Sequence, residues 1–292
     1  MTMKGRALGL GVFLGSAVVL GACAEVETEP PVAAASLLID KSEAAIESPI
    51  QLTYRFAVTA GIPDDFRVFV HVTDLDGTIL WHDDHDPPEP TSTWQAGQTI
   101  EYTRTRFVPL FPYIGRANVL IGLHRGNERL VLTTPDGGGE VDGGRAYLVG
   151  GFELLPTSEN IFLIYKSGWH PAEFSPEDPA REWQWTDQSA VLGLRNPRRD
   201  VTLFLEYDAR PDAFGETPQV VTVYAGNEAV DTFEATQTTP TLRRIAISAA
   251  ALGTDDMAEL RVVVDRTFLP TDTAADSREL GLRVYHVFVD SR

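Results

Sequence analysis

"IQLTYRFAV", residues 50–58, places an apolar side chain at nearly every second position. A period of two is that of a β-strand with one face toward a core and the other toward water. The alternation recurs in three further runs: "FRVFVHV" (66–72), "TIEYTRTRFV" (99–108) and "ANVLIGLH" (117–124). Asp76 and Gly77, in "DLDGT" (74–78), follow the second of these runs. They predict a hairpin turn, because glycine tolerates positive φ.

The alternation is interrupted near residues 153–162 and resumes in the second half of the chain. The later runs are separated by Pro, Gly, Asn and Asp: "FLIY", "EWQWTDQSAVLGLRN", "VTLFLEYDA", "QVVTVYAG", "TLRRIAIS", "AELRVVVD" and "ELGLRVYHVFV". "AISAAALGTDDMAEL" (246–260) comes nearest to a helical stripe and is predicted to be a strand followed by a loop. We therefore predict an all-β fold with two tandem, jelly-roll-like β-sandwiches, of residues 37–155 and 156–292.

Residues 1–22 carry the features of an export signal. Lys4 and Arg6 precede an apolar stretch that is interrupted by glycine, too short for a membrane span, and ends in small residues. "LGAC" (20–23) resembles the bacterial lipobox. The resemblance implies cleavage by signal peptidase II before Cys23, with a diacylglycerol and then a palmitate-type chain on that residue, so that the membrane is a partner through the lipid. Cys23 is the only cysteine, so no disulfide is expected.

The segment after the signal is expected to hold the protein away from the membrane. Residues 23–36, "CAEVETEPPVAAAS", are predicted to form an acidic, Pro- and Ala-rich tether. Ala24 follows the cysteine in place of aspartate, which by the enterobacterial sorting habit favours the outer membrane in a Gram-negative cell. The formal net charge of −18 predicts an acidic surface that repels nucleic acid and anionic headgroups.

"LWHDDHDPP" (80–88) is the densest group of ionisable residues. On an extended strand His82, Asp84 and Asp86 share one face, while Asp83 and His85 point away. A zinc site needs three or four ligands, so others would have to come from positions such as His71 or His124. Our main hypothesis is a strand entering a Pro-rich loop, whose aspartates accept backbone N–H bonds and whose histidines support the turn. The alternatives are acid/base work and a metal-assisted hydrolase that uses His82, Asp84 and His85.

Other chemical motifs are weak. The loop "TTPDGGGEVDGG" (133–144) carries Asp136, Glu140 and Asp142, but it lacks the spacing of an EF-hand, so a hairpin connection is preferred over a calcium site. The same loop has no Lys-Ser/Thr ending that would hold phosphate. The sequence contains no GxSxG, HExxH or CxxC motif. We therefore predict a non-enzymatic protein with no cofactor and no bound metal.

Four residues are candidates for ligand binding: Trp169 and Glu173 in "GWHPAEF" (168–174), and Trp183 and Trp185 in "EWQWT" (182–186). Two residues apart on a strand, Trp183 and Trp185 lie on one face. Indole faces with polar neighbours are suited to stacking on sugar rings, which is one hypothesis. The other is that the tryptophans fill the core of the sandwich.

Three parts of the chain carry a family resemblance. "FRVFVHVTDLDG" with the following "DDHDPPEPTSTWQAGQTIEYTRTRFVPLFPYIG", "GWHPAE…EWQWT…LGLRN" and "RELGLRVYHVFV" resemble uncharacterised bacterial envelope lipoproteins, whose β-sandwich modules are similar to those appended to membrane glycosyltransferases. The resemblance implies a cell-envelope location and contact with surface polysaccharide or an envelope protein. It implies no catalytic residue.

Overall fold

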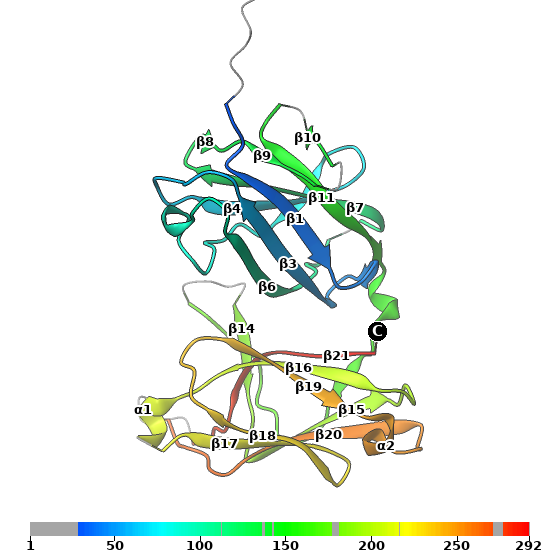
Figure 1. Cartoon of the computed structure of the whole chain (residues 1–292). Helices are drawn as coiled ribbons and strands as arrows, with labels where there is room; N and C mark the ends of the chain where they lie inside the picture. The colour runs from blue at the N-terminus through cyan, green and yellow to red at the C-terminus, as the bar shows by residue number, and fades with distance from the viewer. Residues whose placement is uncertain are drawn as a thin grey trace, which may run out of the picture. The chain divides into compact units, whose positions relative to one another are not determined.

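Four β-sheets make up the described part of the chain, two in each half, as shown in the computed structural model (Figure 1). The structure describes residues 29–111, 113–135, 138–141, 143–176, 181–215, 217–270 and 277–291. Residues 31–292 form one compact unit, in which buried apolar side chains gather in two clusters. The predicted all-β fold class is confirmed. The division into two sandwiches that fold alone stays a prediction.

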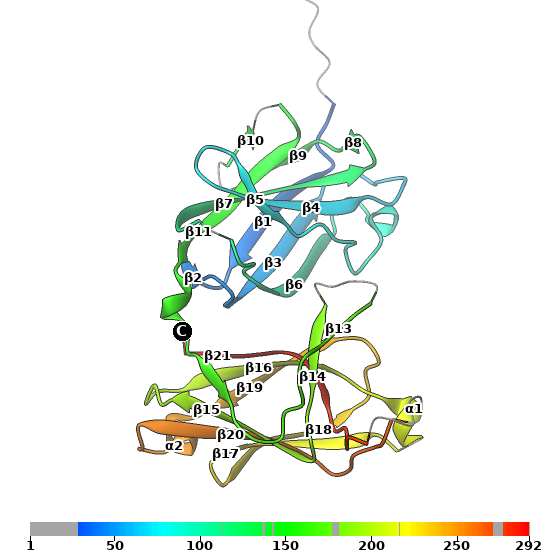
Figure 2. The ribbon, with the colours of Figure 1, turned by 180° about the vertical axis from the view of Figure 1, so that it is seen from behind.

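The first half has a four-stranded and a seven-stranded sheet, which lie one behind the other in Figure 1 and are seen from the opposite side in Figure 2. The smaller sheet has the order β6 (Thr99–Phe107), β3 (Pro49–Val58), β1 (Ala33–Ile39) and β9 (Leu132–Thr133). The larger has the order β10 (Glu140–Val141), β11 (Ala146–Leu155), β7 (Gly115–Arg125), β4 (Arg67–Thr73) and β5 (Ile79–His82), with β2 (Glu43–Ala45) beside β11 and β8 (Glu128–Arg129) beside β7. A short 3-10 helix, η1 (Thr91–Thr93), precedes β6.

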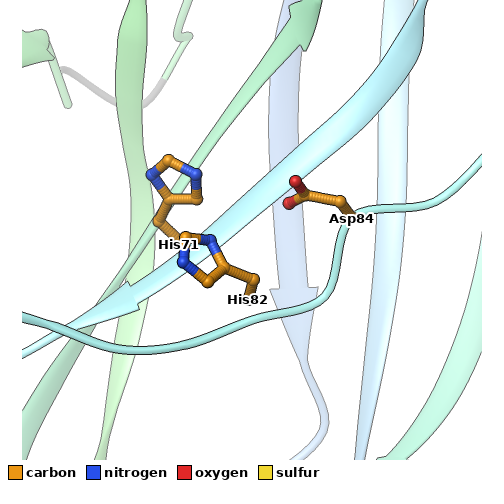
Figure 3. A group of neighbouring side chains, drawn as sticks. All are labelled: His71, His82 and Asp84. Carbon is orange, nitrogen blue, oxygen red and sulfur yellow. The ribbon is translucent and has the colours of Figure 1, made fainter.

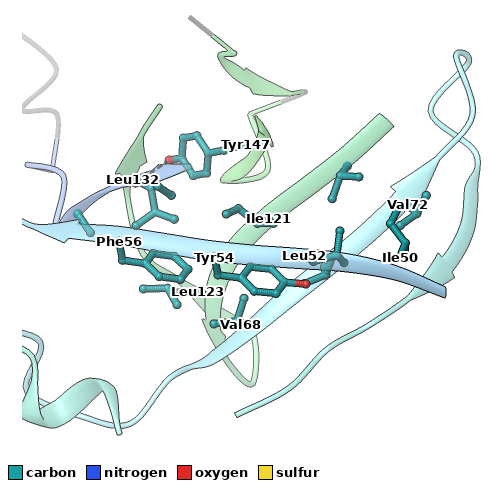
Figure 4. Packing of buried hydrophobic residues seen from close by; sticks show 14 of the residues in the cluster. Ile50, Leu52, Tyr54, Phe56, Val68, Val72, Ile121, Leu123, Leu132 and Tyr147 are labelled. Atoms are coloured by element: carbon teal, nitrogen blue, oxygen red, sulfur yellow. Dashed lines mark hydrogen bonds between the residues drawn. The ribbon is translucent and has the colours of Figure 1, made fainter. Parts of the chain in front are cut away.

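The alternating side chains of the two sheets meet in one core (Figure 4). Tyr54 and Phe56 of β3 are fully buried, as are Val68 of β4 and Ile121 of β7. At about 25 cal/mol per Å² of apolar area removed from water, this burial is the main favourable contribution to folding of this half. The period of two in the sequence therefore corresponds to an inward and an outward face on each strand.

The second half has two five-stranded sheets. One has the order β12 (Leu163–Tyr165), β15 (Ser189–Arg195), β20 (Met257–Val264), β17 (Gln219–Ala225) and β18 (Glu228–Ala235). The other has the order β13 (Glu173–Phe174), β14 (Glu182–Trp185), β21 (Arg283–Asp290), β16 (Val201–Asp208) and β19 (Thr241–Ile247). Three short helical turns complete it: η2 (Thr157–Glu159), α1 (Pro211–Phe214) and α2 (Ala249–Leu252). α2 begins the stretch after β19 that we predicted to be a loop, with Ser248 capping its first turn by accepting the N–H of Ala251.

The tether predicted for residues 23–36 overlaps the first strand, β1. Ala33 and Ala35 lie in β1, are fully buried, and pair with Val58 and Phe56 of β3. Alanine carries too little apolar surface to show a clear alternation, yet its small side chain fits where β1 packs beneath the neighbouring sheet. The strand therefore starts inside the segment 23–36. The signal 1–22 and Cys23 lie outside the described residues.

The predicted hairpin at Asp76 and Gly77 is present between β4 and β5. Gly77 has a φ of +83°, a conformation that glycine adopts without steric cost. Asp74 holds the turn, because its Oδ1 accepts the N–H groups of Asp76 at 2.9 Å and Thr78 at 2.8 Å. Among the described residues no helix has the length and apolar character needed to cross a membrane.

Candidate functional site

Three of the four predicted binding residues come together on β13 and β14. Glu173 pairs directly with Trp183, and Trp185 follows on the same face of β14. The Oε2 atom of Glu173 accepts the indole N–H of Trp183 at 3.1 Å and that of Trp185 at 3.4 Å. One carboxylate therefore sets the orientation of both rings.

Trp169 lies apart from this group. It forms an isolated bridge with Thr186. Because Thr186 is the neighbour of Trp185 along the chain, the side chains of Thr186 and Trp185 point to opposite faces. Its indole N–H donates to the carbonyl of Val191 at 3.0 Å, and Tyr165 packs against its ring edge-on at 4.9 Å. Trp169 also packs on the apolar cluster of the second half. In this position it is partly buried at the border of the core.

An arginine occupies the space between the two tryptophans of β14 and Tyr285 of β21. The guanidinium carbon of Arg283 is 5.5 Å from the ring centroids of Trp183, Trp185 and Tyr285. Such cation–π contacts are worth about 0.5–2 kcal/mol each, more where water is excluded. Trp185 is only 4% exposed, so its ring is no open stacking surface. Trp185 is therefore buried in the protein and does not form an exposed surface on which a sugar ring could stack.

A cavity of about 380 Å³ lies beside Trp185. That volume is within the range of about 300–1,000 Å³ typical of small-molecule sites. Phe268 packs edge-on against Trp185 with ring centroids 5.5 Å apart, and both rings line the cavity. The remaining wall residues are Glu173, Arg210, Asp212, Ala213, Leu269, Pro270, Arg278 and Leu280. The cavity thus combines aromatic walls with charged groups.

Two ion pairs line this cavity. Arg278 Nη2 is 2.9 Å from Glu173 Oε1, and Arg210 Nε donates to Asp212 Oδ1 at 2.8 Å. The hydrogen bonds from Arg210 hold the pKa of Asp212 below its usual range. The guanidinium of Arg210 also lies 5.7 Å from the Trp185 ring centroid and 5.5 Å from that of Phe268. Charged groups of both signs therefore lie beside the two aromatic rings.

The sequence did not point to Arg210, Asp212, Phe268 or Arg278. They come from α1 and its preceding residue, from the segment after β20 and from the segment before β21, which are distant from Trp185 along the chain. Each lies in a turn-like stretch without alternating apolar and polar residues. A charged or aromatic residue is common in such a stretch and does not by itself indicate a site. Only the spatial neighbourhood shows their common role.

The histidine–aspartate stretch forms a second group in the first half. His71 of β4 pairs directly with His82 of β5, and their rings meet edge-on with centroids 4.6 Å apart. Asp84 lies beside them (Figure 3), and one potential ligand atom from each of the three residues lies within 4.8 Å of the others. The Oδ1 atom of Asp84 accepts the backbone N–H of Val70 at 2.9 Å, as expected for an aspartate supporting the local backbone.

The structure contradicts the predicted alternative group of His82, Asp84 and His85. His85 is 5% exposed and lies on the opposite face, where its Nε2 is 2.8 Å from the Tyr102 hydroxyl and its Nδ1 is 2.8 Å from the carbonyl of Asp83. Its ring packs edge-on against Tyr54 at 5.0 Å. The strand continues to pair with β4 as far as His85, so the alternation keeps His85 turned away from the other two.

Asp83 and the glycine-rich loop have structural partners. Asp83, whose side chain is 4% exposed, lies 2.6 Å from Arg106 Nε and 3.3 Å from Arg104 Nη2. In the loop, Glu140 Oε1 accepts the backbone N–H of Arg145 at 2.7 Å. Asp136 and Asp142 lie outside the described residues. Glu140 therefore serves as a local acceptor in the connection between β10 and β11.

Comparisons with known proteins assign no family. No protein-family model matches the chain, and no curated protein matches it at the significance required. A β-glucuronidase of Bacteroides uniformis is 10% identical, with a TM-score of 0.29, over 87% of this chain and 30% of its own. The CBM51-2 and INT domains of Clostridium perfringens ZmpB are 9% identical, with a TM-score of 0.25, over 62% of this chain and 38% of their own.

A third solved structure, the alkylpurine DNA glycosylase AlkC of Pseudomonas fluorescens bound to DNA with an abasic site analogue, is 15% identical, with a TM-score of 0.28, over 44% of this chain and 31% of its own. The matches thus span about a third of the length of these solved chains. Likenesses at these TM-scores carry no argument about the activity of this chain.

Proposed function

We propose that this protein is a non-enzymatic, lipid-anchored protein of the cell envelope that binds surface polysaccharide in the cavity beside Trp185. In a Gram-negative cell the anchor would place it at the outer membrane. The lipobox-like "LGAC" (20–23) supports the anchor, with Cys23 as the lipidated residue. The acidic composition, with a net charge of −18, argues against nucleic acid as the ligand.

The observation that carries the proposal is the pairing of aromatic and charged groups around one cavity. Phe268, which is partly exposed, offers apolar ring surface beside the buried Trp185, while Glu173 and Asp212 offer carboxylate oxygens beside Arg210 and Arg278. A sugar ring has C–H groups on its faces and hydroxyls on its rim, which match this arrangement. The two carboxylates balance the two guanidinium groups in charge, so a neutral sugar fits better than a strongly anionic one.

The hydrolase alternative has weaker support. It needs His82, Asp84 and His85 to act at one point, and His85 lies on the opposite face in contact with Tyr102. Around the cavity, each carboxylate of the two ion pairs faces an arginine. The hydrogen bonds from Arg210 hold the pKa of Asp212 below its usual range, which favours a constant negative charge over the proton exchange that acid/base catalysis requires.

We expect a single cavity to bind a sugar unit weakly, and many anchored copies together to bind one polysaccharide more strongly. Stacking of one base on an aromatic side chain is worth about 1–3 kcal/mol in nucleic-acid sites, and we take the same scale for one sugar ring. Many anchored copies on one surface would meet repeated units of one polysaccharide. The resulting gain in effective concentration raises the overall affinity without a new contact.

The experiment is a binding assay with polysaccharide purified from the envelope of the source cell. Asp212→Asn removes the charge of one wall group at nearly constant size, and Arg278→Gln replaces the guanidinium of another with a shorter, neutral amide. Loss of a hydrogen bond to a charged group costs about 1.5–3 kcal/mol, so we expect affinity to fall about tenfold or more. Asp256→Asn is the matched control, because Asp256 pairs with Arg198 at a distant site and its side chain is 94% exposed.

Wild-type protein that retains no polysaccharide would overturn the proposal. So would wall variants that bind as tightly as the Asp256→Asn control. Melting temperatures of all three variants identify any loss of binding that comes from unfolding. Envelope polysaccharide digested to monomers serves as a competitor, and we expect it to compete only at high concentration.

A further inference from the structure

We propose that His71, His82 and Asp84 bind one divalent transition-metal ion of the zinc class on the outer face of the seven-stranded sheet. The site is separate from the cavity beside Trp185 and does not depend on the function proposed for it. Its ligand set is two imidazole nitrogens and one carboxylate oxygen, the donor types that zinc prefers. It differs from the group expected from the sequence because His71 takes the place of His85.

The backbone places the three residues on one patch of the sheet. His71 and His82 are direct partners across the β4–β5 pair, which puts their Cβ atoms about 4.5–5.5 Å apart. Asp84 is two residues beyond His82 and therefore points to the same side. A backbone bond from Asp83 N to Val70 O and a bond from Val70 N to the side-chain Oδ1 of Asp84 hold this segment against β4.

The side chains are close to the separations that zinc requires. Potential ligand atoms of the three residues lie within 4.8 Å of one another. Bonds of about 2.0–2.2 Å at tetrahedral angles put neighbouring ligand atoms roughly 3.3–3.6 Å apart. His82 is exposed, so a change of its side-chain rotamer toward the other two ligands would not disturb the buried core. Asp84 keeps Oδ2 for the ion while Oδ1 holds the Val70 N–H.

Charged and titratable groups of both signs surround His71. Burial lowers the pKa of His71, and the neighbouring His82 lowers it further, while Asp84 acts in the opposite direction. Arg129 and His124 also lie near His71 and disfavour added positive charge. Asp84 is the acidic group of the triad that offsets them.

The three protein ligands leave at least one coordination position for water or an external ligand. β5 is the last strand in the order of its sheet, so the ion would also join an edge strand to its neighbour. Because the site forms only when β4 and β5 are paired, bound metal stabilises the folded state in proportion to the logarithm of metal concentration. Metal binding can therefore be measured from the stability of the folded protein as well as from the number of ions bound per chain.

The test is a titration of the metal-free protein in detergent with Zn²⁺, followed by calorimetry and by melting temperature. We expect one ion per chain and a melting temperature that rises with Zn²⁺. Co²⁺ provides a spectroscopic check, since its visible absorption reports tetrahedral coordination by nitrogen and oxygen. His71→Ala and His82→Ala should each weaken binding at least tenfold, and Asp84→Asn should weaken it less.

His124→Ala is the matched control, because His124 is a nearby histidine outside the ligand set. It should keep wild-type stoichiometry and affinity. Absence of stoichiometric binding in the wild type overturns the proposal. Binding that survives in the His71→Ala/His82→Ala double variant, or that falls equally in His124→Ala, overturns the assignment of these ligands. Circular dichroism shows whether each variant keeps its β structure.

Discussion

Arg283 and Asp208 form a two-point ion pair in which the carboxylate is almost wholly buried. Arg283 Nε donates to Oδ1 of Asp208 at 2.7 Å, and its Nη2 donates to Oδ2. The side chain of Asp208 is 1% exposed, and the hydroxyl of Tyr285 donates to the same Oδ2 at 2.8 Å. This pair supports the aromatic group from which the candidate cavity is built.

Removing Arg283 should destabilise the protein strongly. Arg283→Met keeps the aliphatic stem but leaves the buried carboxylate of Asp208 without its cation, a kind of change that costs about 3–5 kcal/mol. We expect urea denaturation to show a loss of that size. Lys166→Met is the matched control, because Lys166 and Glu259 have side chains 39% and 55% exposed, and such pairs contribute about 0–1 kcal/mol. Equal losses in the two variants would contradict the distinction.

Gly168, next to Trp169, should tolerate no side chain. Its φ is +77°, and a Cβ added there would lie 1.9 Å from the carbonyl oxygen of Ser189. Gly253 has nearly the same φ, +76°, with nothing within 4 Å of an added Cβ. At this residue's ψ of −166°, Gly253→Ala therefore measures the backbone strain alone, about 1–3 kcal/mol. We expect Gly168→Ala to lose clearly more stability in thermal unfolding, and a loss no greater than that of Gly253→Ala would show that the contact relaxes.

His85 should make the protein less stable in mild acid. Burial holds the pKa of His85 below its ordinary value of about 6.5, the value that applies in the unfolded chain. Above pH 6.5 the imidazole is neutral in both states, and stability is at its full value. As the pH falls through 6.5, the unfolded chain takes up the proton first, so stability is lost progressively down to the folded pKa.

Urea denaturation at several pH values above and below 6.5 checks this expectation. His85→Gln can keep a hydrogen bond to the Tyr102 hydroxyl but cannot take up the proton, so its stability should fall less steeply in acid. Burial also lowers the pKa values of His71 and His286, and part of the pH dependence should therefore persist. An unchanged slope in His85→Gln would refute the role assigned to His85.

Strand alternation explains why the fold class could be predicted and the cavity could not. β3 and β4 carry large apolar residues at every second position, and these side chains form the first core. β1 was partly missed because Ala33 and Ala35 are small. Phe69 is buried although it lies on the outer face, because the guanidinium of Arg129 lies over its ring at 4.4 Å from its centroid. Local alternation cannot report such cover from a distant strand.

The sequence allowed prediction only of those site residues that lie on strands close to one another along the chain. Glu173, Trp183 and Trp185 occupy two short, nearby strands, and the structure brings them together. Arg210 and Phe268 reach the same cavity from segments whose pairing the sequence does not reveal. The facing of His71 and His82 depends on a register shift between Val72 and Thr73, which the turn residues alone do not specify.

Cys23 should determine whether the protein is held on a membrane. Acyl chains contribute about 0.8 kcal/mol per buried CH₂, so a lipid-modified cysteine gives long-lived attachment. Cys23→Ser removes the single thiol of the chain and should move the protein from the membrane fraction to the soluble fraction. Fractionation after a salt wash measures this, and mass spectrometry of the N-terminal peptide identifies the lipid. Sedimentation of the Cys23→Ser protein with washed membranes would disprove lipid anchoring.

The two halves should fold separately. Each has its own apolar cluster and two sheets, and each has more than 100 residues, enough to enclose a core. We expect fragments 31–155 and 156–292 each to give a β-type circular dichroism spectrum and cooperative unfolding. If both fragments are insoluble or unfolded, the chain folds as a single unit.

The start of β1 provides an internal control for the first fragment. A fragment that begins at residue 37 loses Ala33 and Ala35, which are fully buried and pair with Val58 and Phe56. It removes four of the seven residues of β1 and the parallel pairing of this strand with β9. Fragment 37–155 should therefore unfold at lower urea concentration than fragment 31–155, or fail to fold. Equal stability of the two fragments would mean that residues 33–36 belong to the tether after all.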